Sequence, residues 1–331
     1  MDRSRRRSSA CGRRALFALF GGGVLAAPAL AQPAWPVGPV RFICVFPPGG
    51  STDLLSRLWC ARMTEITGQQ FIVDNRAGSG GTVGTEAIAR AHPDGATIGL
   101  ASVGPMSIAP TLYRRLPYDV NRDFAWICGL WQLPNLLVVR NELPARSLPE
   151  LIALCRAAPG RHSYASSGAG TTLHLAGEMF KQMAGLDILH VPYRGGGPAY
   201  VDLLAGRVDM IFGNFPEASR LAREGKVRPL ATTGAERSPQ MPDVPALAEV
   251  LPGFEITSWG GACGPAGIPP PLAARIALLG REALGQPELR RRFEEGGATP
   301  WWTTPEGLAE FRRENEARFA PLIRASGAVV E

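Results

Sequence analysis

Four short loops of the sequence combine glycines with hydroxyl side chains, a composition suited to holding an anion. They cover residues 48–53 (PGGSTD), 78–82 (GSGGT), 166–172 (SSGAGTT) and 193–197 (YRGGG). Glycine lets the backbone approach a ligand closely, and the N–H groups at a helix start attract negative charge. Taken singly, each loop is most simply a tight turn with a helix cap. The four together favour a site that grips a small acid from more than one side.

A nucleophilic site is the alternative from another class of chemistry. Ser166 or Ser167, together with His174 or His190, would supply the serine and histidine of a secreted hydrolase. The GxSxG pattern that exposes such a serine is absent from this stretch. Asp53, just inside an expected helix start, is most simply a capping acid, although its carboxylate would also suit a ligand amine.

Nucleotide, metal and disulfide chemistry have little support. Gly78, Gly80 and Gly84 are spaced one residue away from the dinucleotide-binding pattern, and no GxxxxGK[ST] pattern occurs. The cysteines include no CxxC pair, and the histidines show no HxH or HExxH spacing. No cofactor, metal ion or disulfide framework is therefore expected.

The loops belong to alternating strands and helices. Val40–Phe46 predicts a strand and Thr52–Thr67 a helix, and the pattern repeats with a strand at 71–73, a helix at 82–91 and a strand at 97–101. Such units predict an α/β fold with mostly parallel sheets. A second series follows, with strands expected at 163–165, 188–191, 209–212 and 229–231 and helices at 148–157, 171–184, 197–205 and 216–224.

Between the two series, residues 126–140 are expected to be extended chain that passes from one domain to another. A strand at 255–262 and helices at 270–284, 287–295 and 305–326 complete the chain. This order predicts a first lobe from residues 32–134 and 253–331 and a second lobe from residues 135–252. Two hinge crossings would join them, an arrangement suited to closing on a ligand.

The basic charge of the chain is concentrated at its N-terminus. Of the 331 residues, 35 are Lys or Arg and 29 are Asp or Glu, and six of the arginines but only one acid fall within residues 1–31. The uncharged run 15–31 ends in Ala29-Leu30-Ala31 and is short for a bilayer span, so residues 1–31 are expected to be a cleaved signal peptide. Arg13-Arg14 is also compatible with twin-arginine export. The nearly neutral remainder argues against nucleic-acid binding.

The order of several blocks resembles one family. VRFICVFPPGGSTDLLSR, FIVDNRAGSGGTVGTEAIARAHPDGATI, HSYASSGAGTTLHLAGEMF, HVPYRGGGPAYVDLLAGRVDM, RPLATTGAERSPQMPDVPALAE and EFRRENEARFAPLIRASG follow one another along the chain. Together they resemble the substrate-binding proteins of tripartite tricarboxylate transporters, the Bug family. The resemblance spans essentially the whole chain after the signal peptide. It implies a periplasmic, two-lobed clamp of the Venus flytrap type.

Carried over by motif, the resemblance also implies the ligand contacts. In the first lobe they fall on Gly49, Gly50, Ser51, Thr52, Asp53, Ser79, Gly80 and Ser102. In the second lobe they fall on Ser166, Ser167, Gly168, Thr171, Thr172, Tyr193, Gly195 and Asn214. The chain departs from the family where members often carry an acid before the asparagine, since Gly213 stands there. Loss of that acid weakens the case for a ligand with an amine.

The sequence thus predicts a monomeric periplasmic receptor without a cofactor. It would capture a small organic carboxylate by hinge closure and deliver it to the membrane subunits of a tripartite tricarboxylate-type transporter. Dicarboxylates and aromatic carboxylates both remain open as ligands. Two alternatives stand beside this one: the secreted serine hydrolase, and a ligand-sensing module that reports to a membrane receptor.

Overall fold

The computed structural model describes residues 35–330. The signal peptide predicted for residues 1–31 lies outside the described residues. From Trp35 onward the chain forms one compact unit. Between residues 35 and 330, none of the helices is long and apolar enough to cross a membrane.

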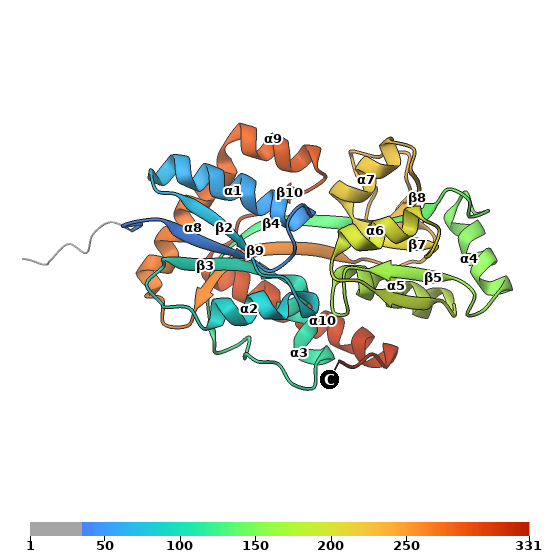
Figure 1. Cartoon of the computed structure of the whole chain (residues 1–331), viewed down its shortest axis with the longest axis horizontal. Helices are drawn as coiled ribbons and strands as arrows, with labels where there is room; N and C mark the ends of the chain where they lie inside the picture. The colour runs from blue at the N-terminus through green and yellow to red at the C-terminus, as the bar shows by residue number, and fades with distance from the viewer. Residues whose placement is uncertain (1–34, 331) are drawn as a thin grey trace, which may run out of the picture. The chain divides into compact units, whose positions relative to one another are not determined.

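Strands and helices alternate along the chain as the sequence predicts (Figure 1). The first series is β1 (Val40–Cys44), α1 (Ser51–Thr67), β2 (Phe71–Asn75), α2 (Thr82–Ala89), β3 (Thr97–Ser102), α3 (Ala109–Leu112) and β4 (Phe124–Arg140). The second is α4 (Leu148–Ala157), β5 (Ser163–Ser166), α5 (Thr172–Ala184), β6 (Leu189–Pro192), α6 (Gly196–Leu204), β7 (Met210–Asn214), α7 (Phe215–Arg223) and β8 (Val227–Thr232). The chain ends with β9 (Thr257–Pro265), α8 (Pro270–Gly285), α9 (Pro287–Glu295), β10 (Thr299–Pro300) and α10 (Pro305–Ser326).

One long strand, β4, belongs to two parts of the sheet. Its residues 124–134 pair with β9, and its residues 135–140 pair with β7 and β8. We call β1, β2, β3, β9, β10 and residues 124–134 the first sheet region, and β5 to β8 with residues 135–140 the second sheet region. In Figure 1, β4 and β9 run across the molecule toward the second sheet region at the right.

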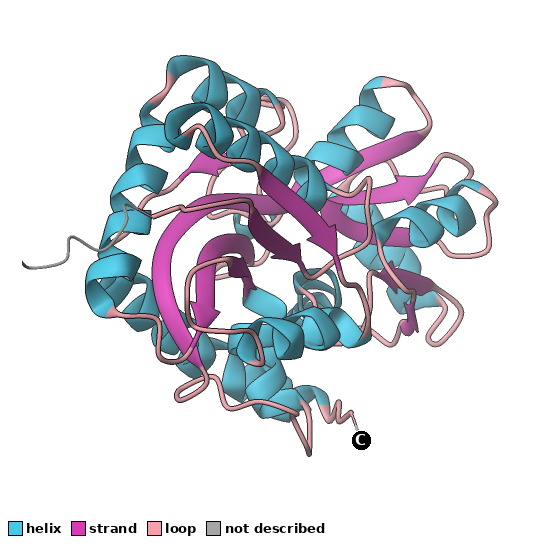
Figure 2. Cartoon of the chain, turned by 60° about the vertical axis from the view of Figure 1, so that its left-hand side comes forward, coloured by secondary structure: helices cyan, strands magenta, loops and turns pink. Residues whose placement is uncertain are grey.

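Parallel and antiparallel pairing divide between these strands. The strands β2-β1-β3 run parallel to one another, and so do β7-β5-β6. The strands β4 and β9, which lie between these two parallel groups, pair antiparallel with each other. Figure 2 shows how strongly the joined strands curl, with helices packed around them.

Buried hydrogen bonds connect the chain segments where one sheet region passes into the other. The Asn135 N–H donates to Thr233 Oγ1 (2.7 Å), and the Thr233 N–H donates to the Asn135 carbonyl (2.9 Å). Thr233 Oγ1 also donates to the Ile256 carbonyl (2.6 Å). Both crossing segments, at 134–135 and 233–256, therefore meet at Thr233.

Helix ends follow local sequence signals. Thr304 caps the start of α10 through its side chain, and Gly327 ends that helix in the left-handed conformation. The sequence analysis missed the π-helix η2 (Gly104–Ile108) and α3, in each of which a proline, Pro105 or Pro110, is the second residue. Proline is tolerated at such positions, but it hides the helical pattern from a periodicity analysis.

The five cysteines of the described residues, Cys44, Cys60, Cys128, Cys155 and Cys263, are all buried and all free. Burial raises the pKa of each thiol, that of Cys155 to about 11 and that of Cys128 to about 12. They act as small apolar side chains of the core, as the absence of paired spacings indicated.

A close approach of β4 to β9 leads to the first prediction. Gly260 pairs with Trp131, and a methyl group on Gly260 would lie 2.3 Å from Trp131 Cε2. We expect Gly260→Ala to lower the free energy of unfolding by about 1–3 kcal/mol, because the indole has to move. Denaturant unfolding followed by tryptophan fluorescence measures this. Gly285→Ala is the control, since no atom lies within 4 Å of its new methyl group; an equal loss in both variants would contradict the packing argument.

Candidate functional site

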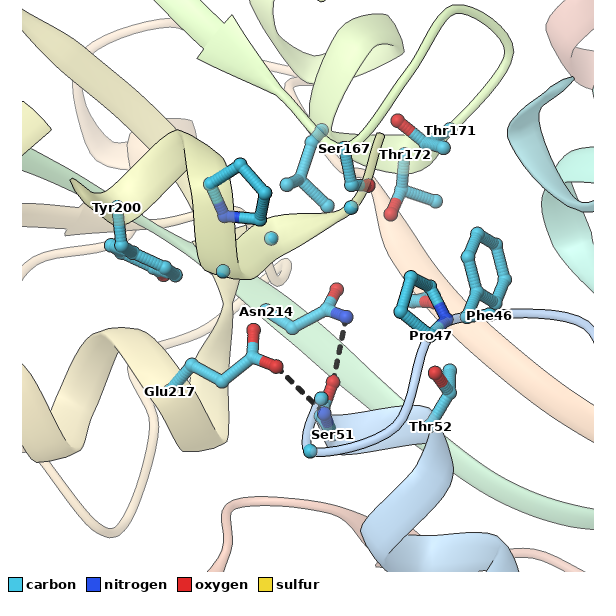
Figure 3. A pocket seen from close by; sticks show the side chains of 18 of the residues that line it. Phe46, Pro47, Ser51, Thr52, Ser167, Thr171, Thr172, Tyr200, Asn214 and Glu217 are labelled. Atoms are coloured by element: carbon cyan, nitrogen blue, oxygen red, sulfur yellow. Dashed lines mark hydrogen bonds between the residues drawn. The ribbon is translucent and has the colours of Figure 1, made fainter. Parts of the chain in front are cut away.

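A cavity of about 360 Å³ lies where loops of the two sheet regions meet (Figure 3). Most of its wall comes from the segments at the carboxyl ends of β1, β3, β5, β6 and β7, and Ser258 at the start of β9 completes it. This is the edge at which α/β sheets bind ligands. Predicted site residues that line it are Gly49, Gly50, Ser51, Thr52, Ser102, Ser167, Thr171, Thr172, Gly195 and Asn214.

The start of α1 forms one side of the cavity. Gly49 adopts a φ of +84°, which favours glycine, and its N–H donates to Asp53 Oδ2 (3.0 Å). Asp53 lies behind the cavity wall and also accepts hydrogen bonds from Arg57 and Asn75. Burial alone would raise the pKa of Asp53, but the bonds from Arg57, Gly49 and Asn75 outweigh it and hold that pKa below its usual value. Asp53 therefore acts as the charged brace of this loop.

The start of α5 forms the opposite side. Thr171 is the N-cap, and its Oγ1 accepts from the His174 N–H (3.4 Å) and donates to the Gly168 carbonyl (2.8 Å). Ser167 and Thr172 line the cavity, and neither hydroxyl bonds to another part of the described chain. Figure 3 shows Ser167, Thr171 and Thr172 grouped together across the cavity from Glu217.

Tyr193 and Gly168, which the resemblance assigns to the ligand contacts of the second lobe, lie outside the cavity lining. The Tyr193 hydroxyl donates to Asp202 Oδ2 (2.7 Å), and Tyr193 is not among the residues that line the cavity. The backbone of Gly168, with a φ of +126°, shapes the loop from outside the cavity.

Ser79 and Gly80 lie where the loop before α2 touches the loop before α5. A methyl group on Gly80 would lie 2.5 Å from the Ala169 carbonyl oxygen, and the Ser79 carbonyl accepts from the Tyr113 hydroxyl (2.9 Å). These two residues do not line the cavity. Their position is a direct contact between the two sheet regions.

The serine and histidine weighed as a hydrolase site do meet. Ser166 Oγ lies 2.7 Å from His190 Nε2, and the His190 ring stacks on His174 with 4.3 Å between ring centroids. Burial first, then His174 and Lys181, lower the pKa of His190 to about 3. Ser166 is fully buried outside the cavity lining, so this pair is set behind the wall that the loop 166–172 forms.

Glu217, in the first turn of α7, is a cavity residue that the sequence analysis missed. Its Oε1 accepts from the Ser51 N–H (2.7 Å), so a carboxylate from the second sheet region sits at the start of α1. Asn214 Nδ2 donates to Ser51 Oγ (2.7 Å) beside it (Figure 3). Burial raises the pKa of Glu217, and Ser51 and Arg220 offset this only in part. In the sequence, Glu217 is recognisable only as an acid that follows Pro216, and acids are common in the first turn of any helix.

Gly213, where the family resemblance led us to expect an acid, has no room for a side chain in this structure. A methyl group there would lie 1.8 Å from the Tyr200 hydroxyl oxygen, so Tyr200 fills the space that a side chain would need. Tyr200 lines the cavity, and its buried hydroxyl has no hydrogen-bond partner in the described part of the chain. With Tyr200 in this position, residue 213 has to be glycine.

The rest of the lining is mainly apolar. Proline, aliphatic and aromatic side chains come from both sheet regions, namely Phe46, Pro47, Pro48, Val103, Leu173, Pro198, Val201, Leu204 and Leu221. The described residues contain no group of three His, Cys, Asp or Glu side chains that could hold a metal ion. Hydrogen-bond donors of the backbone and hydroxyl groups are thus set in apolar walls, where they interact strongly with an anion.

Solved structures with this fold define the class. The chain has a TM-score of 0.87 and 34% identity to R. palustris Rpa4515 with adipate, covering 89% of this chain and 99% of that one. It has a TM-score of 0.85 and 31% identity to the periplasmic binding protein BugD, covering 90% and 100%. The protein therefore has the two-lobed α/β fold of the periplasmic binding proteins.

Its sequence gives the family within that class. Residues 55–328 match the family described as the tripartite tricarboxylate transporter family receptor. BugT of Bordetella pertussis is 37% identical over 309 residues, which cover 92% of this chain and 94% of BugT. The chain belongs to the tripartite tricarboxylate transporter receptor family, as the resemblance predicted.

The two threonines of α5 are expected to differ in their effect on folding. Thr171→Val removes a cap and should lower the free energy of unfolding of the ligand-free protein by about 1 kcal/mol. Thr172→Val keeps the shape of the side chain and removes a hydroxyl that has no hydrogen-bond partner within residues 35–330, so the stability should change little. Thermal or denaturant unfolding of both variants compares them directly. Equal losses would show that Thr172 is also a structural hydroxyl.

Glu217 predicts a pH dependence of stability. Below the ordinary pKa of 4.5 the carboxyl group is neutral in the folded and unfolded states alike. Because the folded pKa is raised, folding becomes less favourable as the pH rises through it. Glu217→Gln should therefore be more stable than the wild type at pH 8, and this gain should shrink toward pH 4. Melting curves at the two pH values test this; a variant less stable than the wild type at pH 8 would contradict it.

Proposed function

We propose that this protein is an extracytoplasmic receptor that captures a small organic carboxylate between its two lobes. It then delivers the acid to the membrane subunits of a tripartite tricarboxylate-type transporter. The observation that carries the proposal is the cavity, into which the starts of α1, α5 and α6 bring backbone N–H groups and hydroxyls from both sheet regions.

The binding force follows from this arrangement. The first N–H groups of a helix lack partners within the helix and attract an anion, each helix start contributing about 0.3–1 kcal/mol and more where water is excluded. Ser102, Ser167 and Thr172 add hydroxyl groups. Such a site holds a carboxylate without a cofactor, a metal ion or a basic side chain at its centre.

Hinge closure is the second part of the proposal. We assign residues 32–134 and 253–331 to one lobe and residues 135–252 to the other, with the crossings next to Asn135 and Thr233. A ligand that contacts both lobes stabilises the closed form by the difference between its affinities for the two forms. The buried bonds at Thr233 give the crossings a fixed point about which the lobes turn.

The relatives support this assignment. Adipate, the acid with which Rpa4515 was solved, is a small carboxylate, and the family description names a transporter receptor. A periplasmic location, export by the predicted signal peptide and function as a monomer agree with such a role. The Ser166–His190 pair lies behind the cavity wall, so binding without turnover is expected.

A thermal-shift screen of the mature protein against mono-, di- and tricarboxylates tests the proposal. An acid at 100 times its dissociation constant should stabilise the folded state by about 2.7 kcal/mol. Thr172→Val should reduce the shift at a fixed ligand concentration, and the bound acid should be recovered chemically unchanged.

The control for this screen is Gly285→Ala, far from the cavity, which should keep the full shift. A protein freed of co-purified ligand that responds to none of the acids would overturn the proposal. So would conversion of the bound acid into a product, combined with loss of that conversion in Ser166→Ala.

A further inference from the structure

The carboxylate of Glu217 occupies a place between two helix starts. Its Oε1 accepts from the Ser51 N–H of α1 (2.7 Å). A methyl group on Gly50 would lie 3.1 Å from the same oxygen, and one on Gly196, at the start of α6, would lie 3.3 Å from Oε2. Both glycines line the cavity. The side chain thus fills the space that two of the glycine loops leave open.

Under the proposed function, a ligand carboxylate could otherwise lie in that space against the glycine loops. A carboxylate at a helix start meets the positive end of the helix and its first N–H groups. Glu217 makes this interaction with α1 from within the protein. A ligand carboxylate near α1 and α6 would meet a like charge, which is unfavourable inside a partly desolvated cavity.

Among residues 35–330, no acidic side chain lines the opposite side of the cavity. Ser167 and Thr172 stand there at the start of α5, and the cavity lining contains no aspartate. Arg220 is the cation of the lining, and its Nη1 already pairs with Glu224 Oε1 at 2.7 Å. One end of the cavity therefore presents hydroxyl groups at a helix start, and the other end holds Glu217 together with Arg220, which lies one turn further along α7 and pairs with Glu224.

We infer that Glu217 acts as a built-in second carboxylate, which makes this receptor selective for monocarboxylic acids with an apolar body over dicarboxylic acids. The ligand carboxylate lies against Ser167 and Thr172, and the apolar body extends toward Glu217 between Leu173, Val201 and Leu204. This inference rests on the proposed function and names its ligand class.

The apolar side chains that line the cavity are suited to cover the apolar part of such a ligand. Val201 and Leu204 of α6 are 61% and 47% exposed although both line the cavity, so their apolar surface is available to a ligand. Covering such a surface is favourable in proportion to the apolar area removed from water. A second charged carboxylate at this end would have to give up its hydration among these side chains.

The test compares two matched pairs of acids that differ only at the far end, hexanoate against adipate and benzoate against terephthalate. Dissociation constants are measured by titration calorimetry at pH 8 for the wild type and for Glu217→Gln. The glutamine is isosteric, and its carbonyl can still accept from the Ser51 N–H, so the variant removes the charge and keeps the contact. Unfolding of the ligand-free variant is measured alongside.

The wild type should bind the monocarboxylate of at least one pair more tightly than its dicarboxylate. In Glu217→Gln the ratio of the two dissociation constants should move toward the dicarboxylate by at least about tenfold, which is about 1.4 kcal/mol. Glu282→Gln is the matched control, because Glu282 is exposed on α8 and outside the cavity lining. It should leave the ratio unchanged.

The outcomes separate the two proposals. If the acids bind and the ratio is the same in the wild type and Glu217→Gln, or the wild type prefers the dicarboxylate in both pairs, the role of Glu217 is refuted and the proposed function stands. If none of the four acids binds and the wider carboxylate screen is also negative, the proposed function fails and this inference fails with it.

Discussion

The buried side chain of Asn135 determines the direction of the hydrogen bonds that reach the cavity. Its Nδ2 donates to the Phe212 carbonyl (3.0 Å) and to Asn214 Oδ1 (3.1 Å), which leaves Asn214 Nδ2 to donate to Ser51 Oγ. Asn135 stands on β4 at the point where the two sheet regions join. A continuous path of hydrogen bonds therefore runs from the crossing strand to the start of α1. Asn135 Oδ1 has no hydrogen-bond partner among the described residues, but the Nδ2 donors of Asn135 and Asn214 are both paired, and leaving either unpaired would be costly. The site geometry is therefore tied to the fold.

The positive potential in the cavity comes mainly from polar groups that carry no full charge. Helix starts and hydroxyls provide a positive potential that needs no buried lysine or arginine, and the apolar walls keep it from being screened by water. Glu217 uses part of that potential from inside the protein. Its neighbours Gly50 and Gly196 lack side chains, and this is what allows a carboxylate to lie so close to two backbones.

The sequence predicted the elements well because their signals are local. Helical spacing located α1 and α10 to within a residue or two, and the segment expected to be extended at 126–140 forms β4. Ser51, Ser167 and Thr172, which the family resemblance predicts as ligand contacts, line the cavity. Motifs do not give side-chain direction, however. The side chains of Asp53 and Ser166 point away from the cavity and form hydrogen bonds that hold their loops. The position of Glu217 and the contact between Tyr200 and Gly213 arise from packing between segments that are distant in the sequence.

The five buried cysteines of residues 35–330 have a practical consequence. Only the thiolate reacts quickly with electrophiles, and burial disfavours that form at all five positions. The thiols of residues 35–330 should thus be almost inert to maleimide dyes and to mild oxidants. In protein that begins after the predicted signal peptide, which contains Cys11, one cysteine engineered on each side of the cavity would carry nearly all of the fluorescent label. Distances between the two sides could then be followed without first replacing the five buried thiols.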